Sequence, residues 1–318
     1  MRNYIIKRLL LILPTLFLFT LMVFVIIRFL PAGVIDLMAQ QQSQFGVPAD
    51  RAQIAHSLGL DVPIYTQYGR WLWNLITHGD LGNSLWRNTT VMAEILTRWP
   101  VTIELGIMGI IISQIIALPI GIYSALRQDS WGDYIARTFA IVCISVPGFW
   151  LATLIIVFPS IWWGYMPPVI YTPFIKDPIR NLQMFIIPAV VLGVGGAGGT
   201  MRMTRTMMLE VLRQDYIRTA WAKGLGERVI VLRHALRNAL IPVVTMAGGS
   251  LLMLISGEVM LEQIFCLPGL GRLAIEAVTQ RDYTLIIGIM LFFGVGLLLL
   301  NLAIDLTYGF LDPRVHYK

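Results

Sequence analysis

Four acidic residues lie within or beside long apolar runs, where an ionised side chain is costly. Glu104 and Asp305 lie inside such runs, and Glu258 and Glu262 lie near the end of another. A charged residue at the centre of a membrane span costs about 2.5 kcal/mol or more, so it usually has a function or a partner. These carboxylates could bind a coupling ion or a cationic solute along a pathway. They could instead pair with backbone groups or with arginines near the membrane surface, such as Arg98.

The sequence contains neither a catalytic motif nor a metal-binding motif. It has no His-Glu-x-x-His spacing, no Gly-x-Ser-x-Gly elbow and no Gly-x-x-x-x-Gly-Lys phosphate loop. The two cysteines, Cys143 and Cys266, are far apart and belong to no Cys-x-x-Cys pair. We therefore expect no catalytic residue, no metal site and no cofactor in this chain.

The composition is that of a membrane protein. Of the 318 residues, 57% are hydrophobic and 13% are charged, whereas a soluble domain has about 25% charged residues. The net charge of +6 does not indicate a nucleic-acid partner, because the basic residues flank apolar segments instead of forming one polar face.

Six apolar segments are long enough to cross the ~30 Å hydrocarbon core as helices. They are residues 9–30, 101–126, 134–158, 184–203, 240–260 and 284–310. The first is longer than the ~7–15 residues of a signal-peptide apolar region, so we interpret it as an uncleaved anchor. The sequence predicts an all-α polytopic membrane protein with six transmembrane helices.

Lysine and arginine are distributed unevenly between the two sets of loops. The set that includes both termini is the richer in these residues, whereas the other set has fewer, spread over longer stretches among acidic residues. By the positive-inside rule, both termini are cytoplasmic. Residues 31–99 then form a small cap on the outer face, with an amphipathic patch at 64–75.

The cytoplasmic stretch 204–238 carries an amphipathic pattern. Leu212, Ile217, Ala220 and Trp221 recur at helical spacing among basic residues, which predicts a short helix ending near Gly224. We divide the chain into residues 1–100, the first span plus the cap, and residues 101–318, a five-span core that contains this loop.

Several spans contain helix breakers. These are Pro119, Pro147-Gly148, Pro242, Gly248-Gly249 and a glycine cluster at positions 193, 195, 196, 198 and 199. Small residues permit close helix packing. They could also serve as hinges in spans that rearrange, and the two interpretations are compatible.

An ordered string occupies the cytoplasmic stretch. Residues 215–226 read Asp-Tyr-Ile-Arg-Thr-Ala-Trp-Ala-Lys-Gly-Leu-Gly, and residues 233–242 read Arg-His-Ala-Leu-Arg-Asn-Ala-Leu-Ile-Pro. The string resembles the coupling loop of binding-protein-dependent ABC importer permeases, in the form of the dipeptide, oligopeptide and nickel subfamily. That loop is a pair of short helices, joined at a glycine, that seats in a cleft of the ATPase subunit. Attraction to anionic lipid would explain the charges but not the ordered string. The resemblance assigns ATPase coupling to Asp215, Tyr216, Arg218, Ala220, Lys223, Gly224, Leu225 and Gly226.

The resemblance extends over nearly the whole chain. Other matches are Leu58-Gly59-Leu60-Asp61, Gly79-Asp80-Leu81-Gly82 with Ser84, Glu262-Gln263-Ile264-Phe265, Arg281-Asp282-Tyr283 and Leu311-Asp312-Pro313-Arg314. Two features depart from the wider pattern. Arg218-Thr219-Ala220 replaces Glu-Ala-Ala, which is typical of the peptide and nickel branch, and Pro31-Ala32-Gly33-Val34 replaces the subfamily's Pro-Gly-Asp-Pro.

The resemblance implies a complex in the cytoplasmic membrane of a bacterium or archaeon. The partners would be a second, homologous permease, two ATPase subunits that bind ATP and Mg²⁺, and an extracytoplasmic substrate-binding protein. Di- or oligopeptides are the expected substrates, while nickel complexes and oligosaccharides stay open. The subfamily usually has a small residue at position 258, so Glu258 is our candidate for favouring a cationic or amine-bearing substrate.

Two other classes compete with this interpretation. In an ATP-independent secondary transporter, Glu104, Asp305 and Glu258 would be coupling-ion sites. A structural membrane scaffold is disfavoured by the Pro and Gly residues inside several spans.

Overall fold

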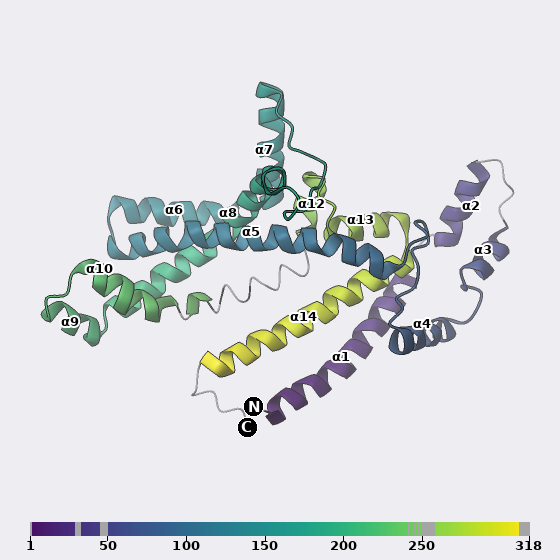
Figure 1. Cartoon of the computed structure of the whole chain (residues 1–318), viewed down its shortest axis with the longest axis horizontal. Coiled ribbons are helices and arrows are strands. Elements are labelled where there is room, and N and C mark those ends of the chain that lie inside the picture. The colour runs from purple at the N-terminus through teal and green to yellow at the C-terminus, as the bar shows by residue number, and fades with distance from the viewer. Residues whose placement is uncertain are drawn as a thin grey trace. The chain divides into compact units, whose positions relative to one another are not determined.

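The computed structural model describes residues 2–28, 33–44, 50–240, 242–244, 246, 249 and 258–311. Pro31-Ala32, most of the predicted span 240–260 and residues 312–314 of the C-terminal motif lie outside the described residues, as does the side chain of Asp305. Within the described part of the chain the regular elements are all helical (Figure 1).

The chain divides into two compact units. Unit 1 comprises Met1–Pro100 and Gly269–Lys318, and unit 2 comprises Val101–Pro268. The unit boundary at residue 100 coincides with the predicted one, but unit 1 also takes in the C-terminal fifty residues. The predicted division into residues 1–100 and 101–318 stays a prediction.

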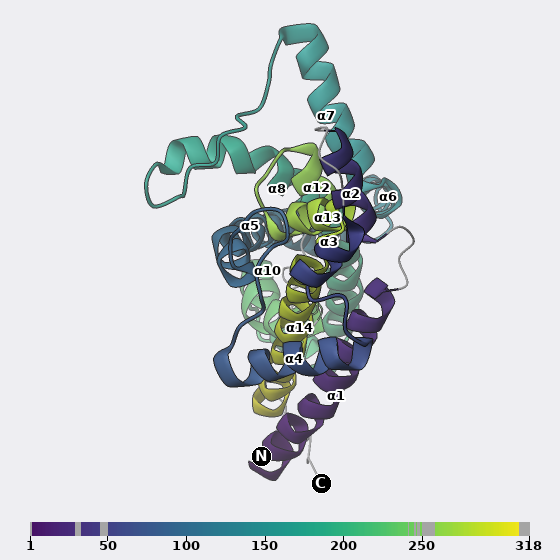
Figure 2. The same cartoon turned by 90° about the vertical axis from the view of Figure 1, so that its right-hand side faces the viewer.

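The described residues of unit 1 form six helices and the first turns of a seventh. They are α1 (Arg2–Arg28), α2 (Val34–Gln44), α3 (Arg51–Ser57), α4 (Ile64–His78), the start of α5 (Val91–Leu126), α13 (Leu270–Gln280) and α14 (Tyr283–Leu311). Helices α1 and α14 lie side by side (Figure 1) and approach closely because Gly294 faces the Phe19 ring. Helix α4 lies across α1 (Figure 2), where Tyr68 packs against Phe24 at 5.3 Å between ring centroids.

The Leu58-Gly59-Leu60-Asp61 motif forms the turn after α3. Gly59 has a φ of +64°, which glycine adopts without strain. The imidazole Nδ1 of His56 lies 2.7 Å from the Asp61 carboxylate, and this hydrogen bond lowers the pKa of Asp61.

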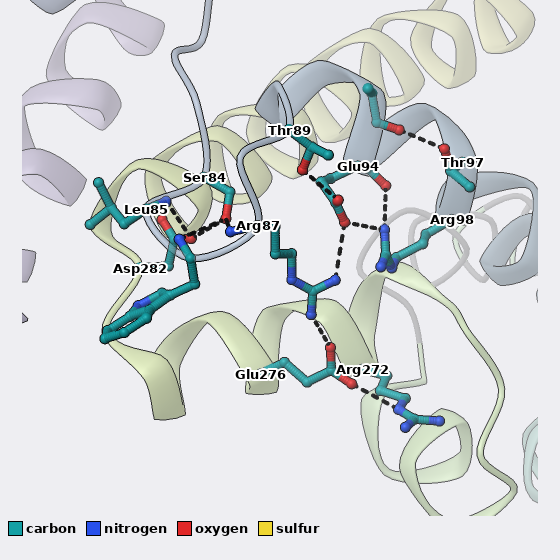
Figure 3. A network of polar contacts seen from close by, with 12 residues as sticks. Ser84, Leu85, Arg87, Thr89, Glu94, Thr97, Arg98, Arg272, Glu276 and Asp282 are labelled. Carbon is teal, nitrogen blue, oxygen red and sulfur yellow. Dashed lines mark hydrogen bonds and ion pairs between the residues drawn. The ribbon is translucent and has the colours of Figure 1, made fainter. Parts of the chain in front are cut away.

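Two motifs that are about two hundred residues apart in sequence meet in unit 1. The buried Asp282 carboxylate accepts hydrogen bonds from Ser84 Oγ at 2.6 Å and from the Leu85 N–H at 3.0 Å (Figure 3). It also caps α14 by accepting from the Leu285 N–H at 3.1 Å. These motifs therefore fix the loop before α5 against the start of α14.

Alternating charges connect the start of α5 to α13 (Figure 3). Glu94 accepts from Arg87 at 3.2 Å and also pairs with Arg98. Arg87 continues to Glu276 at 2.6 Å, and Glu276 pairs with Arg272 at 3.0 Å. From the sequence, Arg98 could pair with one of the four carboxylates in or beside the apolar runs. In the described structure its partner is Glu94, which is not one of those four.

Unit 2 holds the rest of α5 and the helices that follow it. They are α6 (Trp131–Ser145), α7 (Gly148–Trp163), α8 (Pro178–Leu212), α9 (Asp215–Ala222), α10 (Glu227–Val229), the π-helix η1 (Ile230–Ala235) and α12 (Val259–Ile264). Helix α6 lies along α8. A Cβ at Gly198 would lie 2.6 Å from the Ala140 carbonyl oxygen, and one at Gly193 would lie 2.7 Å from Ile112. Close packing is therefore confirmed for these two glycines.

Four described helices are long and apolar enough to cross a membrane. They are α1, α5, α8 and α14, and the pair α6–α7 would add a fifth. These helices coincide with five of the predicted spans. The pair is bent by 93° where Pro147 follows Val146, because proline lacks the N–H and disfavours helix at the residue before it. Only 17% of the apolar window of α1 is buried, as suits a lipid-facing helix. The chain is an all-α polytopic membrane protein.

Candidate functional site

Helix α9 ends in a glycine-dependent cap. Gly224 has a φ of +75°, its N–H donates to the Trp221 carbonyl at 2.9 Å, and the Leu225 N–H donates to the Ala220 carbonyl at 3.4 Å. These two bonds form a Schellman motif, which requires a left-handed residue after the helix. The predicted helix end near Gly224 is confirmed. A Cβ at Gly224 would meet no atom within 4 Å, so conformation, not space, selects glycine.

The inner face of α9 is anchored in an apolar cluster. Ile217 is 0% exposed and Ala220 is 6% exposed, and both pack with Met208 of α8 and with residues of η1. Ala125 at the end of α5 belongs to the same cluster. This burial joins α9 to the ends of two long helices, and we call α9, Gly224, α10 and η1 the α9–η1 unit (Figure 1).

The outer face of α9 is polar and exposed. Arg218 pairs with Asp215 at 3.2 Å, with side chains 75% and 93% exposed. Tyr216 Oη accepts from Asn238 Nδ2 at 2.8 Å, which ties α9 to the helix after η1. Lys223 and Gly226 are also exposed. Six of the eight predicted coupling residues are exposed, whereas Ala220 is buried and Leu225 is half-buried.

Trp221 departs from its predicted position. The periodicity placed it among the apolar residues of the helix, but its side chain is 49% exposed. An exposed tryptophan beside exposed charges is a common anchor in protein interfaces. The sequence offered no signal of this exposure, since Trp221 follows the buried Ile217 by four residues, which is the spacing of a shared helix face.

A buried ion pair lies at one end of α5, α6 and α8. Asp133 of α6 is 0% exposed and receives two hydrogen bonds of 2.8 Å from Arg205 of α8, through Nε and Nη2. Ser124 of α5 and the N–H of Asp129 also donate to it, and Arg137 forms a longer ion pair with it at 3.8 Å. We call this group the Asp133 centre. Sequence reasoning missed it, although Ser130 followed three residues later by Asp133 has the spacing of a capping box.

A cavity of about 360 Å³ lies between α5, the start of α7, α8 and α12. Its walls are mostly apolar or glycine, with few polar side chains. The polar side chains are those of Thr102, Ser113, Gln114 and Glu258. The cavity volume falls in the usual range of small-molecule sites, about 300–1,000 Å³.

Three of the four predicted pathway carboxylates have described side chains, and the surroundings of these three differ. Glu258 lines the cavity and is half-buried. Glu262 is 0% exposed and accepts from Thr102 Oγ1 at 2.6 Å. Glu104 lies beside the side chain of Asn181, and it is not among the residues that line the cavity. Of these three described carboxylates, Glu258 alone lines the cavity.

Comparisons with known proteins identify the family. Residues 117–317 match the family model of the binding-protein-dependent transport system inner membrane component, and residues 1–106 match the model of its N-terminal region. The chain belongs to this family. It is an ABC transporter permease subunit, and a multi-pass protein of the cytoplasmic membrane.

Relatives of this permease align over its whole length. The dipeptide transport system permease protein DppB of Escherichia coli K12 is 35% identical over 342 residues, covering 100% of both chains. The protein of the same name from Alkalihalophilus pseudofirmus is 38% identical over 337 residues, again covering 100% of both chains.

A solved structure supports the fold of the permease. The inward-facing MetNI methionine ABC transporter contains a chain with a TM-score of 0.56 and 18% sequence identity. The match covers 70% of this chain and 97% of that chain. At this identity the likeness concerns the fold alone.

Proposed function

We propose that the chain forms half of the transmembrane pathway of an ATP-driven importer of di- or oligopeptides. It spans the membrane six times, with both termini in the cytoplasm, and pairs with a second, homologous permease. Two ATPase subunits bind and hydrolyse ATP with Mg²⁺, so this chain is not itself catalytic. An extracytoplasmic binding protein delivers the substrate. The names of the full-length relatives support the peptide assignment.

The observation that carries this proposal is the two-sided construction of α9. Its outer face presents Asp215, Arg218 and Trp221 to a partner, while Ile217 and Ala220 hold its inner face in the apolar cluster. A short helix anchored in this way moves as a rigid body with the helices that hold it. Docking of an ATPase on the outer face would therefore displace α8 and the end of α5.

The Asp133 centre extends this connection to α6. Arg205 lies on α8, ten residues before the start of α9, and its guanidinium binds Asp133 through two parallel hydrogen bonds. Such a planar, charge-assisted pair fixes both distance and orientation. We propose that movement of the α9–η1 unit on ATP binding reaches α5, α6 and α8 together and opens the pathway outward, and that hydrolysis resets it.

The test compares two glycines with the same backbone role. Gly164 ends α7 as Gly224 ends α9: its φ is +62°, and a Cβ there would meet no atom within 4 Å. Gly224→Trp and Gly164→Trp therefore impose similar backbone strain. We expect co-purification of the ATPase subunits to be lost with Gly224→Trp and kept with Gly164→Trp.

Transport is measured in proteoliposomes with ATP inside and the loaded binding protein outside. We expect uptake of radiolabelled dialanine by wild type to require ATP and to cease with Gly224→Trp. Uptake driven by an ion gradient in the chain alone would instead indicate a secondary transporter. Binding of dipeptides, nickel or oligosaccharides by the cognate binding protein decides between the substrates.

A further inference from the structure

The cavity of unit 2 is open because glycines replace side chains along its walls. A Cβ built on Gly195 of α8 meets no atom within 4 Å, and Gly106 of α5 and Gly148 of α7 also line the cavity. Gly109 of α5, which also lines the cavity, instead packs tightly, since a Cβ there would lie 2.6 Å from Leu192 of α8. Helices α5 and α8 are therefore held together at Gly109 while leaving a space beside Gly195.

Glu258 is the charged residue of this space. Its side chain is half-buried, and among the described residues its carboxylate has neither a hydrogen-bond donor nor an ion-pair partner. Burial of a charge without a partner is costly, so the position favours any cation that enters the cavity. Glu262, one turn later on α12, instead accepts a hydrogen bond from Thr102 Oγ1 at 2.6 Å.

The remaining polar groups suit a solute with an amide backbone. Ser113 and Gln114 of α5 supply a hydroxyl and a carboxamide, which can both donate and accept. Apart from Thr102, whose hydroxyl donates to Glu262, the rest of the wall is apolar or glycine, which accommodates small side chains without selecting among them. A cavity of about 360 Å³ lies near the lower limit for small-molecule sites, which suits a solute of one or two amino acids.

We propose that this cavity is a substrate subsite of the pathway, in which Glu258 binds the ammonium group of an amino-terminal or other primary amine. The inference rests on the proposed function, because it assigns the subsite to the solute that the importer carries. The subsite adds a selectivity step within the permease itself, which acts on the solute after the binding protein has released it. Anionic or amine-blocked solutes would lose this contact.

The direct test is equilibrium binding of radiolabelled dialanine to the purified transporter complex without the binding protein. We expect wild type to bind dialanine, unlabelled dialanine to compete and N-acetyl-dialanine to compete at least tenfold less well. Glu258→Gln should weaken binding about tenfold or more, since a hydrogen bond to a charged group is worth about 1.5–3 kcal/mol. Glu210→Gln, at an exposed carboxylate of α8 outside the cavity lining, should leave binding unchanged.

A steric variant separates the cavity from the charge. Gly195→Leu should abolish binding without a clash in the fold, because the added side chain enters open space. Gly69→Leu is the matched control, since Gly69 is also a helical glycine with no atom within 4 Å of a Cβ and lies on α4 in unit 1. It should bind dialanine as wild type does.

The outcomes distinguish this inference from the proposed function. Normal ATP-dependent uptake together with absent dialanine binding, or with binding that Glu258→Gln does not change, overturns the subsite and leaves the importer standing. Absence of ATP-dependent uptake in wild type overturns the importer. Equal binding of dialanine and its acetylated form overturns the assigned ammonium contact.

Discussion

Asp133 and Glu258 are both carboxylates of unit 2, but their surroundings are opposite. Asp133 is 0% exposed, and its two oxygens meet the Arg205 guanidinium, the Ser124 hydroxyl and a backbone N–H. Glu258 is half-buried beside a cavity, and within the described part of the chain its carboxylate meets no donor.

The difference separates a structural charge from an available one. A buried carboxylate is tolerated when every oxygen is paired, and its charge is then neutralised by the fold. A carboxylate that has no partner beside an open cavity keeps its negative charge available, and a cationic ligand can neutralise that charge. Stability measurements on both kinds of site therefore test the comparison directly.

The largest effect is expected at the Asp133 centre. Arg205→Met removes both 2.8 Å hydrogen bonds to the buried Asp133 charge and leaves it only the longer ion pair with Arg137 at 3.8 Å, so we expect the free energy of unfolding to fall by about 3 kcal/mol. Urea titration of the detergent-solubilised protein, followed by tryptophan fluorescence, measures it. Arg202→Met is the control, because Arg202 is exposed and lies one turn earlier on α8. An equal loss in both variants would contradict the assignment.

A second variant extends the comparison to unit 1. Asp282→Ala removes the cap of α14 and leaves the Ser84 hydroxyl and the Leu85 N–H without their acceptor, so we expect a loss of about 2–3 kcal/mol. Asp177→Ala is the control, since Asp177 caps α8 through one N–H at an exposed position, and should cost about 1 kcal/mol. The difference between the two losses of unfolding free energy measures what the buried contacts of Asp282 with Ser84 and Leu85 contribute. If the two losses were equal, Asp282 would be an ordinary cap.

Thr102→Val tests the carboxylate nearest to Glu258 in sequence. The substitution keeps the side-chain shape but removes the hydroxyl that donates to the buried Glu262, so we expect a loss of about 1.5 kcal/mol. Thr153→Val should change stability by less than about 0.5 kcal/mol, because the exposed Thr153 hydroxyl bonds only to a carbonyl of its own helix. A similar loss at both threonines would show that the Glu262 contact adds nothing.

Local features of the fold could be predicted from the sequence. Apolar length determines a span, and five predicted spans coincide with described helices or with the bent pair α6–α7. A left-handed glycine is equally local, and the end of α9 at Gly224 follows from it. The break at Pro147 was also evident, but its 93° bend depends on packing and could not be predicted.

Features that depend on tertiary pairing could not be predicted. Asp133 and Arg205 are 72 residues apart, and in the sequence each is only a polar residue near the end of an apolar run. Glu258 and Glu262 look alike by position, yet packing against Thr102 buries one and leaves the other beside the cavity. Charge patterns locate such groups without revealing which are paired.

The smallest expected effect is the most informative. Because the Glu258 carboxylate has no donor within the described residues, Glu258→Gln removes a charge without breaking a contact, and the free energy of unfolding should change by less than about 0.5 kcal/mol. Glu262→Gln, one turn later, should destabilise the protein measurably, since it weakens the bond from Thr102. Urea titration of both variants makes the comparison. A loss of about 1 kcal/mol or more for Glu258→Gln would mean that the fold already uses this charge, and the proposed ammonium subsite would lose its basis.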